Sequence, residues 1–225
     1  MGVIEIPVAI YKYLDTRACA DIFLSINTEQ KPAPRSLVFD LYGEASEVVV
    51  DVPALRARDI AMSLHESSDS PYNDLIRFPG AAKSKFGVDL STVVSAIKPL
   101  VEDKGVFDSV VIRELEMQTR VLFNYLGVLR DWYWTKWTEK DNAFLSAAGF
   151  SGALDFLKNR LIPYCNTKRS YKAEAIRQAM KLDKHNLITR GELKGLQGRA
   201  AIRTVYDRLT DRFLPAAEIE ESIEI

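Results

Sequence analysis

Three polar side chains in one short loop are the first group in the sequence that could bind a ligand. Asn27, Gln30 and Arg35 occupy a stretch that two prolines prevent from being helical throughout. Two amides and a guanidinium present donors and acceptors in fixed planes, which suits contacts to phosphate groups or base edges. The same residues also suit an ordinary helix–loop–helix turn, with Asn27 as a cap and Gln30 exposed. Arg35 would then pair with Asp40 or Glu29, and both interpretations stay open.

A second group consists of basic side chains toward the C-terminal end. Residues 158–212 contain 14 Lys/Arg against 5 Asp/Glu, a net charge of +9, whereas residues 1–157 carry -6 and residues 213–225 carry -4. Such segregation indicates a polyanionic partner, because phosphate neutralisation requires a stripe of cations. The alternative is a solvated surface, balanced by the acidic first part of the chain or by a protein partner. The candidate DNA-binding residues are Lys168, Arg169, Lys172, Arg177, Lys181, Arg199, Arg203 and Arg208.

Sequence motifs for catalysis or metal binding are not found. The sequence has no GxxxxGK[ST] loop, no GxGxxG turn and no nucleophile elbow. Its two histidines, His65 and His185, have no second His or Cys at metal-ligand spacing. Glu114 and Glu116 lie two residues apart on a predicted helix and point in different directions, so they make a poor acid–base pair. We therefore expect no catalytic residue, no metal and no cofactor.

Four aromatic residues gather near the end of the longest predicted helix. Trp132, Tyr133, Trp134 and Trp137 could stack on nucleobases. At the end of an amphipathic helix, however, such clusters more often pack in the core, and we favour that interpretation.

The elements that would position these residues are predicted to be mainly α, with some β structure. Val3 to Tyr13 is rich in β-branched residues and predicts an N-terminal strand. Leu75–Phe78 and Lys85–Leu90 predict a short hairpin around Pro79-Gly80. Apolar residues at three- and four-residue steps predict a large helical bundle. The predicted helices span residues 16–27, 35–42, 53–66, 91–101, 108–137, 142–147, 152–161, 171–182 and 197–213.

The two cysteines indicate a compartment. Cys19 and Cys165 match no metal or redox spacing. Cys19 shares the apolar face of the first predicted helix with Ile22 and Phe23, so we expect it to be buried. Unpaired cysteines, together with the absence of a signal-peptide pattern, are typical of the reducing cytoplasm. No apolar run approaches the roughly 18 residues of a membrane span, and we expect no membrane association.

The first part of the chain resembles a known family. The motifs IPVAIY, FLSIN and RSL follow one another between residues 6 and 37, joined by a polar turn with glutamine and proline. They resemble the DGQHR-domain family, which includes the B protein of the DNA-phosphorothioation (Dnd) system. The likeness continues more weakly to about residue 160. The Asp-Gly-Gln-His-Arg signature itself is absent; since the family places it before the IPV strand, we expect a fragment of a longer ParB-like domain or one that has lost its signature half.

The resemblance implies a fold like the C-terminal part of a DGQHR/ParB-like domain. Residues 1–43 would be the remnant of its α/β part, residues 44–160 a helical domain, and residues 161–225 a basic helical region with an acidic tail. The first function that it implies is a DNA-associated regulatory or accessory protein of a DNA-modification or defence system, without catalysis.

Two other functions remain open. The chain could be part of a ParB-like nuclease or nucleotidase, to which Asn27, Gln30 and Arg35 would contribute while another chain or an upstream segment supplied the rest. It could instead be a protein-interaction module, whose N-terminal strand pairs with a partner sheet or with a second copy of the chain.

Overall fold

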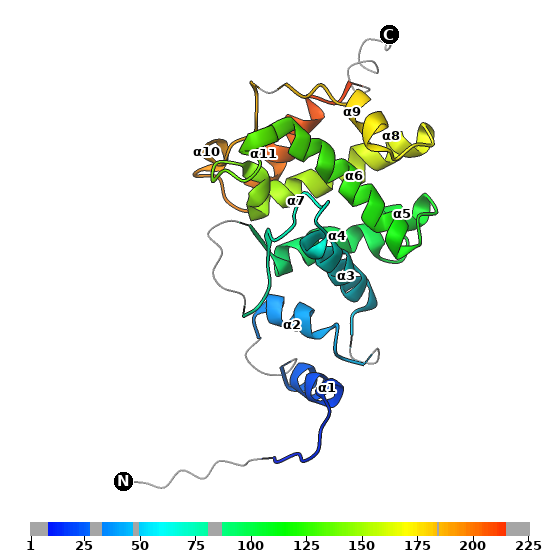
Figure 1. Ribbon diagram of the computed structural model, residues 1–225, viewed down its shortest axis with the longest axis vertical. Helices are drawn as coiled ribbons and strands as arrows, with labels where there is room; N and C mark the ends of the chain where they lie inside the picture. Colours follow the sequence, from blue (N-terminus) through cyan, green and yellow to red (C-terminus); the bar gives the residue numbers. More distant parts are fainter. Residues whose placement is uncertain (1–8, 28–32, 47–49, 81–86, 184, 215–225) are drawn as a thin grey trace.

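The computed structural model describes residues 9–27, 33–46, 50–80, 87–183 and 185–214, and these are mainly helical, as predicted (Figure 1). The helices are α1 (Thr16–Asn27), α2 (Arg35–Leu41), α3 (Val52–Glu66), α4 (Leu90–Val101), α5 (Val106–Ser109), α6 (Leu115–Tyr133), α7 (Ala147–Phe156), α8 (Ile162–Thr167), α9 (Ala173–Gln178), α10 (Arg190–Leu193) and α11 (Arg199–Thr210). The shorter elements are the strands β1 (Ile76–Arg77) and β2 (Val88–Asp89), the 3-10 turns η1 (Trp134–Lys136) and η2 (Ala143–Leu145), and the π-helical turn η3 (Leu157–Leu161).

One hydrophobic cluster runs through the helical bundle, from Ala54 in α3 to Phe213 beyond α11. Tyr72 is fully buried in it, and its ring meets the ring of Phe150 edge to face at 5.2 Å. The Tyr72 hydroxyl donates a 2.9 Å hydrogen bond to the carbonyl of Phe144. Residues on both sides of position 160 thus contribute to the same core.

Helices α7 and α11 pack unusually closely in this core. At Gly152, an added Cβ would lie 2.7 Å from the Ile202 carbonyl oxygen and 2.7 Å from the Val205 Cβ. Carbon atoms in contact prefer separations of about 3.5–4.0 Å. A glycine at this position is therefore what allows the two helices to approach each other.

The helix α1 begins as predicted but buries a different face. Asp15 caps it by accepting a 2.7 Å hydrogen bond from the Ala18 backbone N–H. The prediction that Cys19 is buried was wrong, because the buried residues of α1 are Ala20 and Leu24. Asp21, on the same side as these two, accepts a hydrogen bond from the Ser46 backbone N–H at 2.7 Å, which holds that side toward the chain around Ser46. Helix α1 lies at the narrow end of the molecule, beyond α2 (Figure 1).

The β structure differs from the prediction in direction. Ile76 pairs with Val88 and Arg77 with Asp89, and the pairing is parallel. The predicted hairpin was wrong, because the strands of a hairpin are antiparallel. Arg77 Nε also donates to the Asp89 carboxylate at 2.9 Å, which ties the two strands together through their side chains.

The predicted N-terminal strand falls partly outside the described residues. Residues 3–8 are not described, and residues 9–13 do not form a strand. Since strand assignment depends on a hydrogen-bonded partner, β-branched composition alone is not enough to make one.

The helix predicted over residues 108–137 is interrupted. Val111 has a φ of 62°, in the left-handed region that β-branched residues rarely adopt, and this position separates α5 from α6. The Ile112 N–H donates back to the Phe107 carbonyl at 2.8 Å. The break leaves Val111 69% exposed and turns Ile112 inward at 4% exposure. The prediction of one continuous helix was therefore wrong.

Candidate functional site

The predicted polar loop is divided between two environments. Gln30 lies outside the described residues. Asn27 Nδ2 donates to a carbonyl one turn earlier at 2.7 Å, so its amide stabilises the end of α1. Arg35 is exposed at the first position of α2 and lines a groove. Asp40, its alternative partner, lies 3.8 Å from Arg58 instead. Of the predicted trio, Arg35 is thus the member that the structure places at a surface where a ligand could bind.

The groove at Arg35 is an open depression of about 560 Å³ between α2, α4, α7 and α11. Small side chains make up much of its lining. The charged and hydroxyl-bearing residues of this lining are Arg35, Ser91, Thr92, Ser95, Ser151, Asp155 and Lys158.

The N-terminal turns of three helices border this groove. The N-cap residues of α4 and α11 make no side-chain capping bond, but in α4 the Ser91 N–H already donates to the Ser36 hydroxyl at 3.3 Å. The first N–H groups of a helix have no intrahelical acceptor and carry partial positive charge, so they favour anions. The groove therefore combines hydroxyl donors, partial positive charge and two cations, which is chemistry suited to phosphate groups. The residues concerned are Ser91 and Thr92 in α4, Ala147 and Ala148 in α7, and Gly198 and Ala201 at the start of α11.

Asp155 is the carboxylate among the described residues that line this groove, and its surroundings shift its pKa. Burial raises the pKa of Asp155 above its usual value, although Lys158 acts in the opposite direction. With Arg35 and Lys158 present, the side chains of the lining carry a net positive charge at neutral pH.

Three of the eight predicted DNA-binding residues are neutralised by neighbouring carboxylates. Their guanidinium groups are therefore less available to a phosphate than their exposure on the helices would indicate. The ion pairs are Arg177–Asp131 at 2.9 Å, Arg203–Asp207 at 2.8 Å and Arg208–Glu192 at 3.3 Å.

The other five predicted residues are exposed and form no ion pair with any residue that the structure describes. Lys168, Arg169 and Lys172 lie at the corner between α8 and α9, which protrudes at one edge of the molecule (Figure 1). Arg169 has a φ of 52°, and this left-handed residue turns the chain from one helix to the next. Lys181 follows α9, and Arg199 begins α11 beside the groove.

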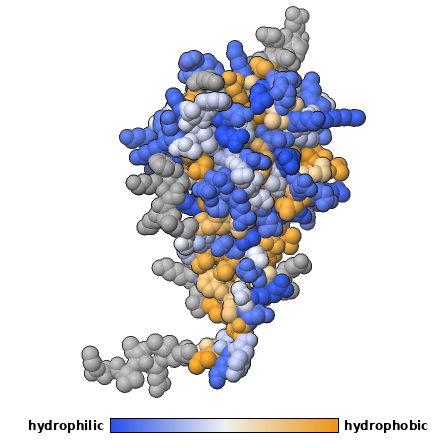
Figure 2. All heavy atoms as spheres, in the orientation of Figure 1, coloured by the Kyte–Doolittle hydropathy of each residue, from blue (hydrophilic) through white to orange (hydrophobic). Residues whose placement is uncertain are grey.

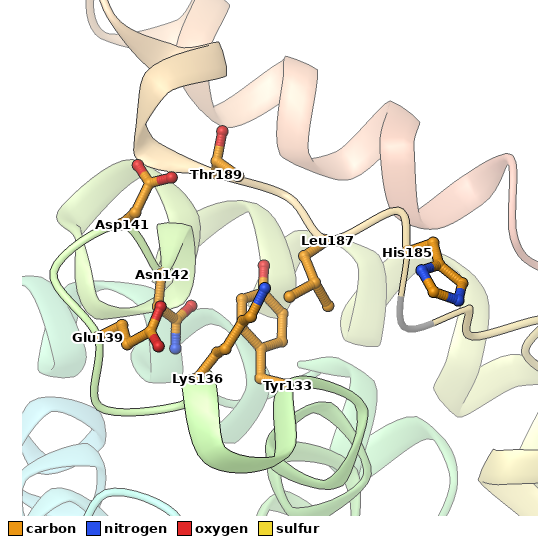
Figure 3. Close-up of a pocket in the computed structure, with 8 residues that line it drawn as sticks. All are labelled: Tyr133, Lys136, Glu139, Asp141, Asn142, His185, Leu187 and Thr189. Atoms are coloured by element: carbon orange, nitrogen blue, oxygen red, sulfur yellow. The ribbon is translucent and has the colours of Figure 1, made fainter.

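A polar pocket of about 310 Å³ lies between the end of α6 and residues 185–189 (Figure 3). The Tyr133 hydroxyl donates to the Ile188 carbonyl, and burial raises the pKa of Tyr133, so this hydroxyl is not a base at neutral pH. Asp141 accepts a hydrogen bond from the Gly191 N–H at 3.2 Å. Figure 3 shows His185 set apart from the other labelled side chains. These groups hold the segment in place and do not form an acid–base pair.

The aromatic cluster is mostly core, as predicted. Trp132, Tyr133 and Trp137 are 4%, 3% and 4% exposed. Trp137 Nε1 donates to the Pro71 carbonyl at 2.6 Å. Trp134 differs, because it is 68% exposed and has a φ of 55°. Stacking of nucleobases is therefore not open to the three buried rings.

Arg212 is a notable residue that the predicted site did not include. It is 8% exposed and lies two residues beyond the end of α11, where it continues the spacing of the buried residues Ala201, Val205 and Leu209. The sequence did contain a signal for its burial, because this arginine recurs at the same helical spacing as three apolar residues. A cation in that register must find polar partners inside the protein.

The described residues contain no group of three or more His, Cys, Asp or Glu side chains that could hold a metal ion. In the same part of the chain, no helix combines the length and apolar character needed to cross a membrane. Comparison with family models, with curated proteins and with solved structures found no match for the sequence or its fold.

Proposed function

We propose that this chain binds DNA through its exposed cations, without catalysis, as an accessory or regulatory protein of a DNA-modification or defence system. The resemblance of IPVAIY, FLSIN and RSL to DGQHR-domain proteins is the reason for proposing a role in a DNA-modification or defence system. The chain would act in the cytoplasm, where its two free thiols, Cys19 and Cys165, stay reduced.

The observation that carries the proposal is the corner between α8 and α9. Lys168, Arg169 and Lys172 are exposed there, and within the described part of the chain none is paired with a carboxylate. Cations that are free of carboxylates release counterions from DNA when they meet its phosphates, and this release drives sequence-independent binding. A protruding corner also reaches a duplex without a deep cleft.

The groove at Arg35 is a second feature that supports DNA binding. Arg35 and Lys158 line it, and Gly198, the residue before Arg199, lies in its wall. One member of the polar loop, Arg35, and one cation of the basic segment, Lys158, therefore line the same surface. Contacts to phosphates from Arg, Lys, hydroxyl groups and helix N-termini position a protein on DNA without reading its sequence.

The test is duplex binding measured by fluorescence anisotropy between about 50 and 200 mM salt. The wild-type affinity should fall steeply with salt. The double variant Lys168→Gln/Lys172→Gln should bind more weakly to every duplex, with a salt slope lower by about 0.9 for each lost phosphate contact. Arg177→Gln is the matched control, since it removes a cation that Asp131 already neutralises. Absence of binding at the lowest salt would refute the proposal.

A second function is protein–protein association through the N-terminal segment. Ile10, Tyr11 and Tyr13 are 79%, 60% and 102% exposed, a run of large side chains that water solvates poorly. In Figure 2, apolar atoms gather toward the narrow end of the molecule that carries α1 and α2. The partner would be another protein or a second copy of this chain.

Light scattering after size exclusion tests the self-association form of this function. Ile10→Lys with Tyr13→Lys should convert an oligomer into a monomer, whereas Val111→Lys, at a residue that is 69% exposed elsewhere, should not. If the wild type is monomeric at high concentration, the partner can only be a different protein. If the wild type is an oligomer and the double variant has the same mass, the N-terminal segment is not the contact between the copies.

A further inference from the structure

The end of α11 holds a buried cation whose charge is not balanced by a carboxylate at contact distance. Arg212 is 8% exposed, and among the described residues no carboxylate lies within ion-pair distance of it. Its guanidinium donates to the carbonyls of Arg208 and of Asn186, the latter at 2.8 Å, and lies 5.2 Å from the centre of the Trp132 ring. These partners satisfy hydrogen bonds and leave the full charge in place.

A second arginine, Arg208, lies one turn earlier, and its charge is paired with a carboxylate. Arg208 uses its Nη2 to contact Glu192 at 3.3 Å and the Asn186 side-chain oxygen at 2.9 Å. Its Nε is buried and has no hydrogen-bond partner among the residues that the structure describes. This Nε is closed to a ligand by its burial, so only the rest of the Arg208 guanidinium can face the cavity.

These two arginines line a small cavity of about 280 Å³ with Lys181. Lys181 is exposed and, within the described part of the chain, has no ion-pair partner. Asp183 and Asp211 complete the charged lining, so its side chains carry three positive charges against two negative ones. Asp183 is already engaged, since one of its carboxylate oxygens accepts the His185 backbone N–H at 2.9 Å. Counting Glu192, which pairs with Arg208, the charges around the cavity balance, so what it offers an anion is the unpaired ammonium of Lys181 and the buried guanidinium of Arg212.

We infer that this cavity binds the phosphate group of a ligand, with Lys181 as its free donor, the Arg208 guanidinium beside it and Arg212 as the buried charge behind them. Charge-assisted N–H···O contacts to phosphate are about twice as strong as neutral hydrogen bonds, and guanidinium geometry suits them. The phosphate can come from a free phosphate ester or from the DNA backbone. If it comes from DNA, the inference rests on the DNA-binding function proposed above; if it comes from a free ester, it does not.

Isothermal titration calorimetry with inorganic phosphate tests the site, with sodium chloride at matched ionic strength as the blank. Arg208→Gln should weaken phosphate binding by about tenfold or more, the loss of one charge-assisted contact. Lys181→Gln, at an exposed position that should not affect folding, should weaken it by about threefold to tenfold. Lys140→Gln removes the same charge at an exposed position between η1 and η2 and should bind phosphate as the wild type does.

Duplex DNA is titrated against the same variants to separate the two sources. Phosphate binding that Lys181→Gln weakens, in a protein that does not bind duplex, supports the cavity and refutes the DNA-binding function. Duplex binding by a wild type that does not bind phosphate, with Lys181→Gln unchanged, overturns the cavity and leaves the DNA-binding function intact. If Arg208→Gln does not fold, the Lys181→Gln result decides.

Discussion

Arg203 and Asp207 form an ion pair one turn apart on α11, with Arg203 Nε 2.8 Å from one carboxylate oxygen and 3.0 Å from the other. Arg203 is 71% exposed, so the pair lies on the surface where DNA could reach it. Asp207→Asn should release the guanidinium and strengthen duplex binding, with a salt slope that steepens by about 0.9 because one more phosphate contact becomes available. Anisotropy over a salt series measures both quantities.

Two variants control for this effect. Asp103→Asn removes an equal charge from the turn after α4, and a gain as large as that of Asp207→Asn would mean that net charge alone is responsible. Arg203→Gln should change the affinity little, since its charge is already neutralised. A large loss in Arg203→Gln would show that the ion pair opens on DNA.

Glycine substitutions should affect stability in opposite directions at two helix positions. Gly152→Ala places a methyl group 2.7 Å from Val205 and should destabilise the fold by about 1–3 kcal/mol, the usual cost of overpacking. Gly127→Ala lies in α6 with open space around its Cβ, and it should stabilise by about 0.5–1 kcal/mol through helix propensity. Denaturant unfolding gives both values, and equal signs would contradict the packing of α7 on α11.

Asp51 should contribute stability that depends on pH. It accepts the Ala54 N–H at 3.1 Å as the cap of α3 and lies 2.5 Å from Lys98. Burial alone would raise the pKa of Asp51, but the hydrogen bonds from Lys98 and Ala54 outweigh it and lower the pKa below 3.8. Because the folded pKa is depressed, this stability is present above the unfolded value and is lost as pH falls through the folded one.

Asp51→Ala should therefore cost about 1 kcal/mol at pH 7, and less as the pH falls below the unfolded value. Lys98→Met should cost between about 0 and 1 kcal/mol, because it removes a half-exposed ion pair and leaves the cap. Urea unfolding at several pH values checks both, and a cost for Asp51→Ala that stays constant down to pH 2 would contradict the assignment.

The two thiols should differ in reactivity. Burial raises the pKa of Cys165 to about 11, whereas Cys19 is exposed on α1. Since the thiolate is the reactive form, a disulfide reagent at neutral pH should label Cys19 and leave Cys165 unmodified until the protein unfolds. Cys19→Ser should remove the fast phase, and rapid labelling of native Cys165 would show that the core around α8 opens.

The raised pKa of Cys165 also makes the stability of the fold depend on pH. The folded pKa of Cys165 lies above its unfolded value of 9.0, so the thiol stabilises the fold fully below pH 9 and loses that contribution as pH rises to about 11. The stability difference between the wild type and Cys165→Ala should therefore narrow across this range. A difference that stays constant would contradict the burial of the thiol.

Local signals in the sequence predicted much of this fold. Asp15 precedes α1 and Pro53 lies in the first turn of α3, and both helices start within a residue of the predicted positions. Capping and proline geometry depend on near neighbours, so a single sequence contains them. The break at Val111 could not be predicted, because apolar spacing continues through it and only tertiary packing accounts for a left-handed valine.

The sequence predicted which basic residues the candidate site contains, but not which carboxylates they pair with. The density of Arg and Lys after residue 158 was evident, yet the sequence could not show that Arg177 turns to Asp131 on another helix, 46 residues away. The cavity at Arg208 and Arg212 depends in the same way on Asn186 and Lys181, which reach it from a separate segment. Apolar stripes likewise mark a helix face without showing whether a partner covers it, which is why Cys19 was misplaced.

The contact between Gly152 and Val205 also has a consequence for synthesis on the ribosome. Helix α7 leaves the exit tunnel before α11 exists, so the surface around Gly152 stays uncovered until almost the whole described chain has emerged. A nascent chain that pauses before α11 exposes apolar surface to chaperones and to other nascent chains. Folding of the core is therefore completed late, by the helix that also carries Arg199 and Arg208.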